Sequence, residues 1–189
     1  DGCLTWTKES LNINEIIPSS QSASDSEKKE ITFSINGRRV FIVFQGANYD
    51  TEYKDGYLRY SNDGIAYHNS KGTTVWDKTF SMQKPQVKIC GNAVAVGDIN
   101  GSTICVFNAS GALGNIDTSL NIAQIEVTGQ GLVAAVLEDN EANYINLYNT
   151  NGEKIYSVKT SLSGDGYPLD ISVSEDGTKL MASYLYVSG

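Results

Sequence analysis

Short apolar runs separated by polar turns recur along this chain, and one such pattern occurs three times. Each copy starts with Ile, has an aromatic residue or His three positions later, continues with Asn, and has Gly three positions after the Asn. The copies are residues 65–76 (IAYHNSKGTTVW), 104–115 (ICVFNASGALGN) and 145–156 (INLYNTNGEKIY). Runs rich in β-branched and aromatic residues are typical of strands, and Asn-x-x-Gly favours a tight turn. Each copy therefore predicts a β-hairpin.

A second pair of predicted strands lies before the second copy, before the third copy, and after the third. Successive Asn residues of the pattern are 39 and 41 positions apart, and about 40 residues with four strands is the repeat of propeller-type arrays. We name the strands of a repeat a, b, c and d in chain order, with the repeated pattern forming c and d. The a and b strands are expected at residues 87–90 and 93–96, 124–128 and 132–137, and 171–174 and 179–186.

The predicted b strands are apolar on both faces, as in Ala93-Val94-Ala95-Val96 and in residues 132–137. An antiparallel strand with one wet face would alternate between apolar and polar residues. Burial of both faces indicates sheets stacked on either side, which is the arrangement of blades in a propeller. The fold class is therefore expected to be all-β, a β-propeller or an incomplete propeller arc of about three and a half four-stranded antiparallel blades.

The expected domain covers residues 31–189, with blades at about 39–80, 87–117 and 122–160 and an incomplete one at 168–189. Arg39–Phe44 and Tyr57–Tyr60 are predicted as strands a and b of the first blade, with a polar loop at 46–56 between them. Residues 31–35 are expected to pair with 39–44 across Asn36-Gly37. Residues 1–30 are interpreted as an exposed terminal segment or linker, in which residues 4–7 could form a short strand.

The predicted fourth blade lacks strands c and d. Either the N-terminal strands complete it and give a small four-bladed ring, or the chain is a fragment of a longer propeller. Propellers have typically about four to eight blades, so the length favours the fragment. Each open end would then be a site of self-association through an unpaired edge.

Composition narrows the classes of partner. The net charge is −8 and the pI is about 4.6, with no basic stripe, so we expect neither nucleic acid nor an anionic membrane surface as a partner. No run approaches the roughly 20 apolar residues of a membrane helix, and no signal peptide is visible. Cys90 and Cys105 lie in strands that strand b separates, and they are expected to be buried free thiols.

Three features could carry chemistry, and each has a structural interpretation that we prefer. Residues 129–134 fit G-x-G-x-x-A, but the following apolar run leads into Glu138 without room for a helix, so an a–b turn is expected instead of a dinucleotide site. His68 is the only histidine, and Phe107 and Tyr148 hold its place in the other repeats. Because no hydrolase, metalloprotease or redox-cysteine motif occurs, we expect no enzymatic activity, no catalytic residue and no cofactor.

The loops between strands b and c and between strands d and a emerge on one face of a propeller, and here they are acidic. Such a face could bind Ca²⁺ through clustered oxygen atoms, or a cationic or sugar ligand. Alternatively it is a solvated rim that keeps the protein soluble. No calcium-loop spacing is present, so no metal ligand is assigned. The residues of this candidate ligand face are Asp63, Asp98, Asn100, Glu138, Asp139, Asn140, Glu141, Asp165 and Tyr167.

Two aromatic residues follow the pattern Gly by four positions, Trp76 and Tyr156. They could stack on a sugar, but we expect them to cover the blade edge and dock against the neighbouring blade.

The Asn-x-x-Gly-x-x-x-aromatic hairpin is similar to the docking hairpin of quinoprotein-type and WD-type propeller repeats. The chain more closely resembles an uncharacterised family of propeller-like proteins of Gram-positive gut bacteria, over roughly residues 60–189. The stretches that carry this resemblance are 64–76, 85–97, 142–152 and 165–185. The resemblance implies a longer, membrane-anchored protein with an extracytoplasmic propeller at the cell surface, and it implies no activity.

Three functions remain open. The first is a non-catalytic extracytoplasmic interaction or scaffold module whose partner is a protein or a glycan. The second is an enzyme or quinone-cofactor propeller whose catalytic residues lie outside these 189 residues. The third is a structural spacer that holds another domain away from the membrane, to which the chain is joined only by an upstream anchor.

Overall fold

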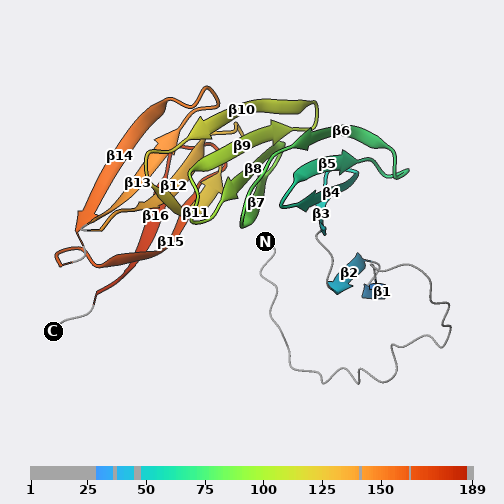
Figure 1. The fold of residues 1–189 in the computed structure, drawn as a ribbon, viewed down its shortest axis with the longest axis horizontal. Coiled ribbons are helices and arrows are strands. Elements are labelled where there is room, and N and C mark those ends of the chain that lie inside the picture. Colours follow the sequence, from blue (N-terminus) through green and yellow to red (C-terminus); the bar gives the residue numbers. More distant parts are fainter. Residues whose placement is uncertain (1–28, 36–37, 45–47, 141, 162, 187–189) are drawn as a thin grey trace, which may run out of the picture.

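The computed structural model describes residues 29–35, 38–44, 48–140, 142–161 and 163–186, with side chains from residue 48 onward. The regular structure of these residues consists of strands, arranged in three four-stranded and two two-stranded antiparallel sheets. In Figure 1 the sheets follow one another in chain order, from β3–β6 through β7–β10 to β11–β16. The all-β expectation is therefore confirmed.

Each four-stranded sheet is a meander in which neighbours in the chain are neighbours in the sheet. The first blade contains β3 (Tyr49–Tyr53), β4 (Gly56–Ser61), β5 (Gly64–His68) and β6 (Thr74–Thr79). The second contains β7 (Pro85–Cys90), β8 (Ala93–Asp98), β9 (Thr103–Asn108) and β10 (Gly111–Asp117). The third contains β11 (Asn121–Val127), β12 (Val133–Glu138), β13 (Ala142–Tyr148) and β14 (Lys154–Ser161). In the fourth, β15 (Tyr167–Val173) pairs with β16 (Leu180–Leu185).

The three repeated patterns form the c–d hairpins β5–β6, β9–β10 and β13–β14, as predicted. Their turns use the expected chemistry. The Asn69 side-chain oxygen accepts hydrogen bonds from the backbone N–H groups of Lys71 (3.0 Å) and Thr73 (3.1 Å). Gly72 closes that turn with a φ of 76°, in the left-handed region that glycine adopts without a steric penalty.

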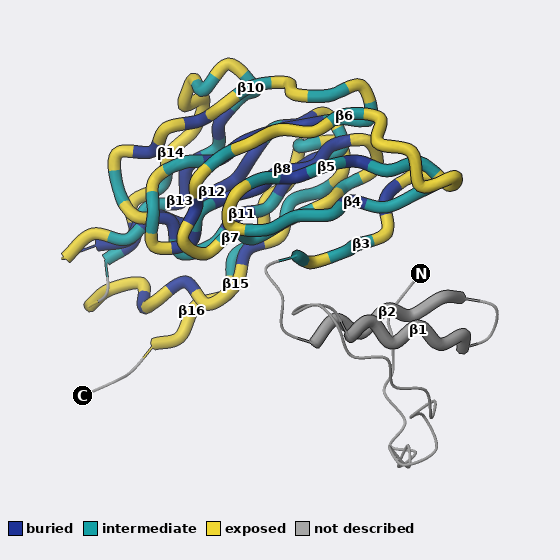
Figure 2. Tube along the Cα trace, turned by 45° about the vertical axis from the view of Figure 1, so that its right-hand side comes forward, coloured by how far each residue is buried: buried dark blue, intermediate teal, exposed yellow. Residues whose placement is uncertain are grey.

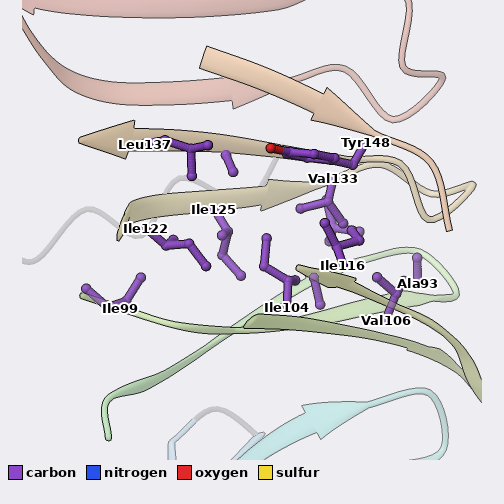
Figure 3. Packing of buried hydrophobic residues seen from close by; sticks show 13 residues of the cluster. Ala93, Ile99, Ile104, Val106, Ile116, Ile122, Ile125, Val133, Leu137 and Tyr148 are labelled. Atoms are coloured by element: carbon purple, nitrogen blue, oxygen red, sulfur yellow. The ribbon is translucent and has the colours of Figure 1, made fainter. Parts of the chain in front are cut away.

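The blades stack face to face, and the core lies between them. Leu58 of the first blade packs in one cluster with Val94 and Phe107 of the second. A second cluster joins Ile104 of the second blade to Ile125 of the third, as Figure 3 shows. The b strands are buried on both faces, over residues 93–97 in β8 and 133–137 in β12. This confirms the interpretation of their two-sided apolar pattern.

Small residues let the third and fourth blades approach closely. Ala134 of β12 is fully buried, and it shares a cluster with Ile145 of the same blade and Ile171 of β15. Figure 2 shows the dark buried strands enclosed between blades and the largely exposed β16 at one end of the array.

The prediction for strand a of the first blade was wrong. Residues 39–44 belong to β2 (Arg38–Phe44), which pairs with β1 (Lys29–Ile35) in a separate two-stranded sheet. Strand a is β3, which lies inside the predicted polar loop. The polar residues of β3 have a structural explanation. Asp50 forms an ion pair with Arg59 of β4 (2.6 Å) on the face turned away from the second blade. That face needs no apolar side chains, so the apolar pattern of a strand is missing.

The structure also tests whether the N-terminal strands complete the fourth blade. In the described residues β1–β2 and β15–β16 are separate sheets, so β1 and β2 do not complete the fourth blade. The predictions for residues 1–28, including the short strand at 4–7, lie outside the described residues.

Candidate functional site

The loops between strands b and c and between strands d and a form one end of the stack, because antiparallel strands return to the same end after every pair. Backbone hydrogen bonds join these loops to one another. The N–H of Phe80 donates to the carbonyl of Asp63 (3.0 Å), and the N–H of Met82 donates to the carbonyl of Asn62 (2.9 Å). We call this end the loop face.

Asp98, a predicted member of the ligand face, stabilises the loop that joins the first two blades. One oxygen of its carboxylate accepts hydrogen bonds from the backbone N–H groups of Gln83 (2.9 Å) and Lys84 (2.8 Å). Asn100 lies in the left-handed region with a φ of 70°, and its backbone N–H donates to the carbonyl of Ile122 in the third blade (2.8 Å). Both residues therefore connect blades.

The loop face is hollowed where the second and third blades meet. The hollow has a volume of about 420 Å³ and is open to solvent. Its walls are the loop that precedes β11 and the loop that follows β12. The lining residues are Ser119, Leu120, Asn121, Glu138, Asp139 and Asn140.

Two acidic side chains line this hollow, and a phenol from the fourth blade contacts one of them. The hydroxyl of Tyr167 donates to a carboxylate oxygen of Glu138. That hydrogen bond, with partial burial and the charge of Glu138, raises the pKa of Tyr167 to about 12. The carboxylate of Asp139 is exposed and accepts a hydrogen bond from the backbone N–H of Asn140 (2.7 Å). The structure thus brings together Glu138, Asp139, Asn140 and Tyr167 from the predicted set.

The remaining predicted residues lie elsewhere on the loop face. Asp165 closes the loop after β14 by accepting hydrogen bonds from the backbone N–H (2.8 Å) and hydroxyl (3.2 Å) of Ser161. Asp63 is exposed in the β4–β5 turn, and its side chain makes no hydrogen bond or ion pair with the described residues. Glu141 lies outside the described residues.

The described residues contain no group of three or more His, Cys, Asp or Glu side chains that could hold a metal ion. The calcium hypothesis therefore gains no ligand cluster from this part of the chain. Among the same residues, no helix is long and apolar enough to cross a membrane.

The other candidate features have structural roles. Residues 128–132 form the turn between β11 and β12, and a strand follows where a dinucleotide site would need a helix. His68 stacks on the ring of Tyr57 at 4.9 Å and lies 3.2 Å from the hydroxyl of Thr74. Cys105 is a buried free thiol as predicted, whereas Cys90 is free but only half-buried.

Sequence analysis missed an aromatic and charged surface on the outer face of the first blade. Besides the Asp50–Arg59 ion pair, the guanidinium of Arg59 lies 5.6 Å from the centre of the Tyr57 ring. On the same face the Tyr57 ring stacks on His68 at 4.9 Å. The alternation Tyr-Asp-Thr-Glu-Tyr at residues 49–53 is the sequence pattern that could have predicted β3.

The repeated sheets and their two-sided packing are the context for the comparisons with known proteins. The model of a family of unknown function (DUF5711) matches residues 34–189. The chain belongs to this family. The DUF5711 match starts earlier than residue 60, so the resemblance seen in the sequence was too short at its N-terminal end.

Solved structures of low sequence identity are similar to this DUF5711 chain. Hsv2 from Kluyveromyces lactis has 12% identity and a TM-score of 0.53, over 76% of this chain and 48% of that one. The WD40 domain of Pan2 from Neurospora crassa has 8% identity and a TM-score of 0.46, over 73% and 44%. BamB from Moraxella catarrhalis has 17% identity and a TM-score of 0.48, over 68% and 40%.

The chain thus spans less than half the length of these three structures. None of the curated proteins matches its sequence significantly. Together with the stacked four-stranded sheets, the structural likeness shows a propeller-like fold.

Proposed function

We propose that this DUF5711 chain is part of a non-catalytic interaction or scaffold module, and that the loop face receives the partner. The observation that supports this proposal is the open hollow of about 420 Å³ in which Glu138 and Asp139 stand beside Asn121 and Asn140. Carboxylates and amides at a concave surface can accept several hydrogen bonds from one partner.

The charge of the hollow indicates the chemistry of the partner. Glu138 is half-buried and Asp139 is exposed, so neither carboxylate needs much desolvation before it contacts a cationic group. The net charge of −8 adds a long-range attraction for positively charged partners and repels nucleic acid. A basic protein segment therefore fits this surface best, and a glycan bound through amide and carboxylate hydrogen bonds is the second candidate.

The proposed setting is extracytoplasmic, at the surface of a cell and in a longer membrane-anchored protein. This part of the proposal rests on the family resemblance in the sequence. A catalytic or quinone-cofactor propeller remains the alternative, and it would need reactive groups from residues outside the described part.

The test compares binding with turnover. The purified chain is used as bait for surface-protein extracts and on a glycan array, and in parallel it is assayed against hydrolase and dehydrogenase substrates. We expect a reproducible partner whose binding falls at least about tenfold in the Glu138→Gln/Asp139→Asn variant, a loss of about 1.4 kcal/mol. The matched control is Glu52→Gln/Asp77→Asn, which removes two exposed charges from the first blade and should bind normally.

Reproducible turnover that disappears in the Glu138→Gln/Asp139→Asn variant would contradict the proposal. Equal loss of binding in both double variants would also contradict it, because a general charge effect would then replace a defined surface.

A further inference from the structure

Strand d of each of the first two blades contacts the c–d hairpin of the blade that follows. Trp76 in β6 stacks on Phe107 in β9, with ring centres 5.1 Å apart and planes inclined by 9°. At the same position of the second blade, Gly114 in β10 approaches the turn between β13 and β14. A Cβ atom on Gly114 would lie only 1.8 Å from the carbonyl oxygen of Thr150.

The corresponding position of the third blade has no such neighbour among the described residues. Tyr156 pairs with Leu147 in its sheet, just as Trp76 pairs with Tyr67 and Gly114 with Val106. Tyr156 is nevertheless 58% exposed. The prediction that this ring docks against a neighbouring blade is therefore wrong for the described residues, because the fourth blade has only strands a and b there.

The edge of β16 is open in the same region. In the complete blades strand b pairs with both a and c, whereas β16 pairs only with β15 in the described residues. Its equivalent β12 is buried over residues 133–137, but Met181 of β16 is 72% exposed. An unpaired edge with apolar side chains is a template for another strand. The other exposed apolar residues nearby are Leu180, Tyr184, Leu185 and Tyr186.

The surface at the opposite end of the array, on the first blade, differs in its chemistry from the edge of β16. The outward face of the first blade carries the row Asp50, Arg59, Ala66 and Asp77 across its four strands. Three charged side chains of that row would lose water against the apolar residues of β16, so head-to-tail stacking of a second copy on β16 is disfavoured.

We propose that β16 and Tyr156 together are the docking surface for a c–d hairpin of the same repeat type, connected to β16 as strand c is connected to strand b in the complete blades. The first strand of this hairpin pairs antiparallel with β16, and its aromatic residue, equivalent to Phe107 and Tyr148, covers Tyr156. The b–c connections of the complete blades are short, at 61–64, 98–103 and 138–142, so the segment that pairs with strand b comes directly after it. This inference does not depend on the proposed function of the loop face.

The length of a solved structure with the same fold supports this connection. The described arc matches Hsv2 with a TM-score of 0.53 while it covers 48% of that chain. About half of Hsv2 therefore extends beyond the part that resembles this arc.

The test supplies such a hairpin to the chain. A copy of residues 101–118, the second c–d hairpin with its flanking residues, is appended after residue 189. The matched control carries Ser in place of Ile104, Val106 and Phe107 in the appended copy only. We expect the melting temperature of the extended chain to exceed that of the control by about 4–8 °C, since each kcal/mol is worth about 2–4 °C at this size.

Tyr156→Ala separates docking from non-specific stabilisation. We expect it to lower the melting temperature of the extended chain by at least about 3 °C and to change the parent chain by less than about 1 °C. Equal melting temperatures for extended chain and control would overturn the proposal, as would an equal effect of Tyr156→Ala in both backgrounds. Light scattering tests a second copy as occupant. Dimers that persist in the extended chain and disappear on Met181→Lys would overturn it, whereas dimers of the parent that vanish on extension would support it.

Discussion

The hydroxyl of Tyr53, at the end of β3, donates a hydrogen bond of 2.7 Å to the backbone carbonyl of Asn92, in the turn between β7 and β8. The bond joins the a–b turns of the first and second blades at the end opposite the loop face. A comparable backbone bond runs from Gly129 to Glu175 between the third and fourth blades (3.0 Å). Hydrogen bonds therefore join neighbouring blades at both ends of their strands, and apolar side chains pack between these two ends.

Removing the Tyr53 hydroxyl should loosen the first blade and change the pH dependence of stability. Burial, and then the neighbouring Tyr67, raise the pKa of Tyr53 to about 12 from 10.0. The unfolded chain releases this proton above pH 10 while the folded chain holds it, so this contribution is complete below pH 10 and is lost as the pH rises towards 12. Urea unfolding at pH 8 should show Tyr53→Phe less stable by about 0.5–1.5 kcal/mol.

The same variant should lose less stability than the natural chain between pH 9 and pH 11. Parallel pH profiles for the two proteins would contradict the assignment of Tyr53 as a buried hydrogen-bonded phenol.

Asp98→Ala should destabilise the chain even though Asp98 was first a candidate for ligand binding. The substitution leaves the N–H groups of Gln83 and Lys84 without their acceptor, at a cost of about 1–2 kcal/mol in chemical denaturation. Asp139→Ala on the same face is the control and should cost less than about 0.5 kcal/mol. Equal costs would remove the structural role of Asp98.

Gly114→Ala should disrupt the junction of the second and third blades. The added Cβ meets the backbone carbonyl of Thr150, which can move only with its turn, so we expect a loss of about 2–3 kcal/mol and a lower melting temperature. Asn115→Ala, an exposed neighbour on the same strand, should change stability by less than about 0.5 kcal/mol. If Gly114→Ala is tolerated as well as Asn115→Ala, the two blades are not packed at this distance.

The sequence was sufficient for the elements whose side chains meet another blade. The Ile-x-x-aromatic-Asn pattern predicted β5, β9 and β13 because their inward residues, such as Ile104 and Ile145, are buried. The sequence did not predict β3, because its outward residues Asp50 and Glu52 face no four-stranded sheet of the described residues and make the strand as polar as a loop.

The candidate site was predictable only in outline. Alternation of the strands placed the acidic loops on one face, but their separate roles depend on contacts that spacing does not encode. Asp98 holds backbone N–H groups from a loop about 15 residues earlier in the chain, and Glu138 meets Tyr167 from the following blade. A list of acidic residues therefore could not separate structural carboxylates from those that line the hollow.

The most direct test of the account, in which neighbouring sheets dock as blades, is a double-mutant cycle on Trp76 and Phe107. Urea unfolding of Trp76→Ala, Phe107→Ala and the double variant should give a coupling energy of about 0.5–1.5 kcal/mol, as expected for stacked rings. The control cycle pairs Trp76 with Tyr148, which packs at the next junction and should show no coupling. Additive losses in the Trp76–Phe107 cycle would contradict the stacked arrangement.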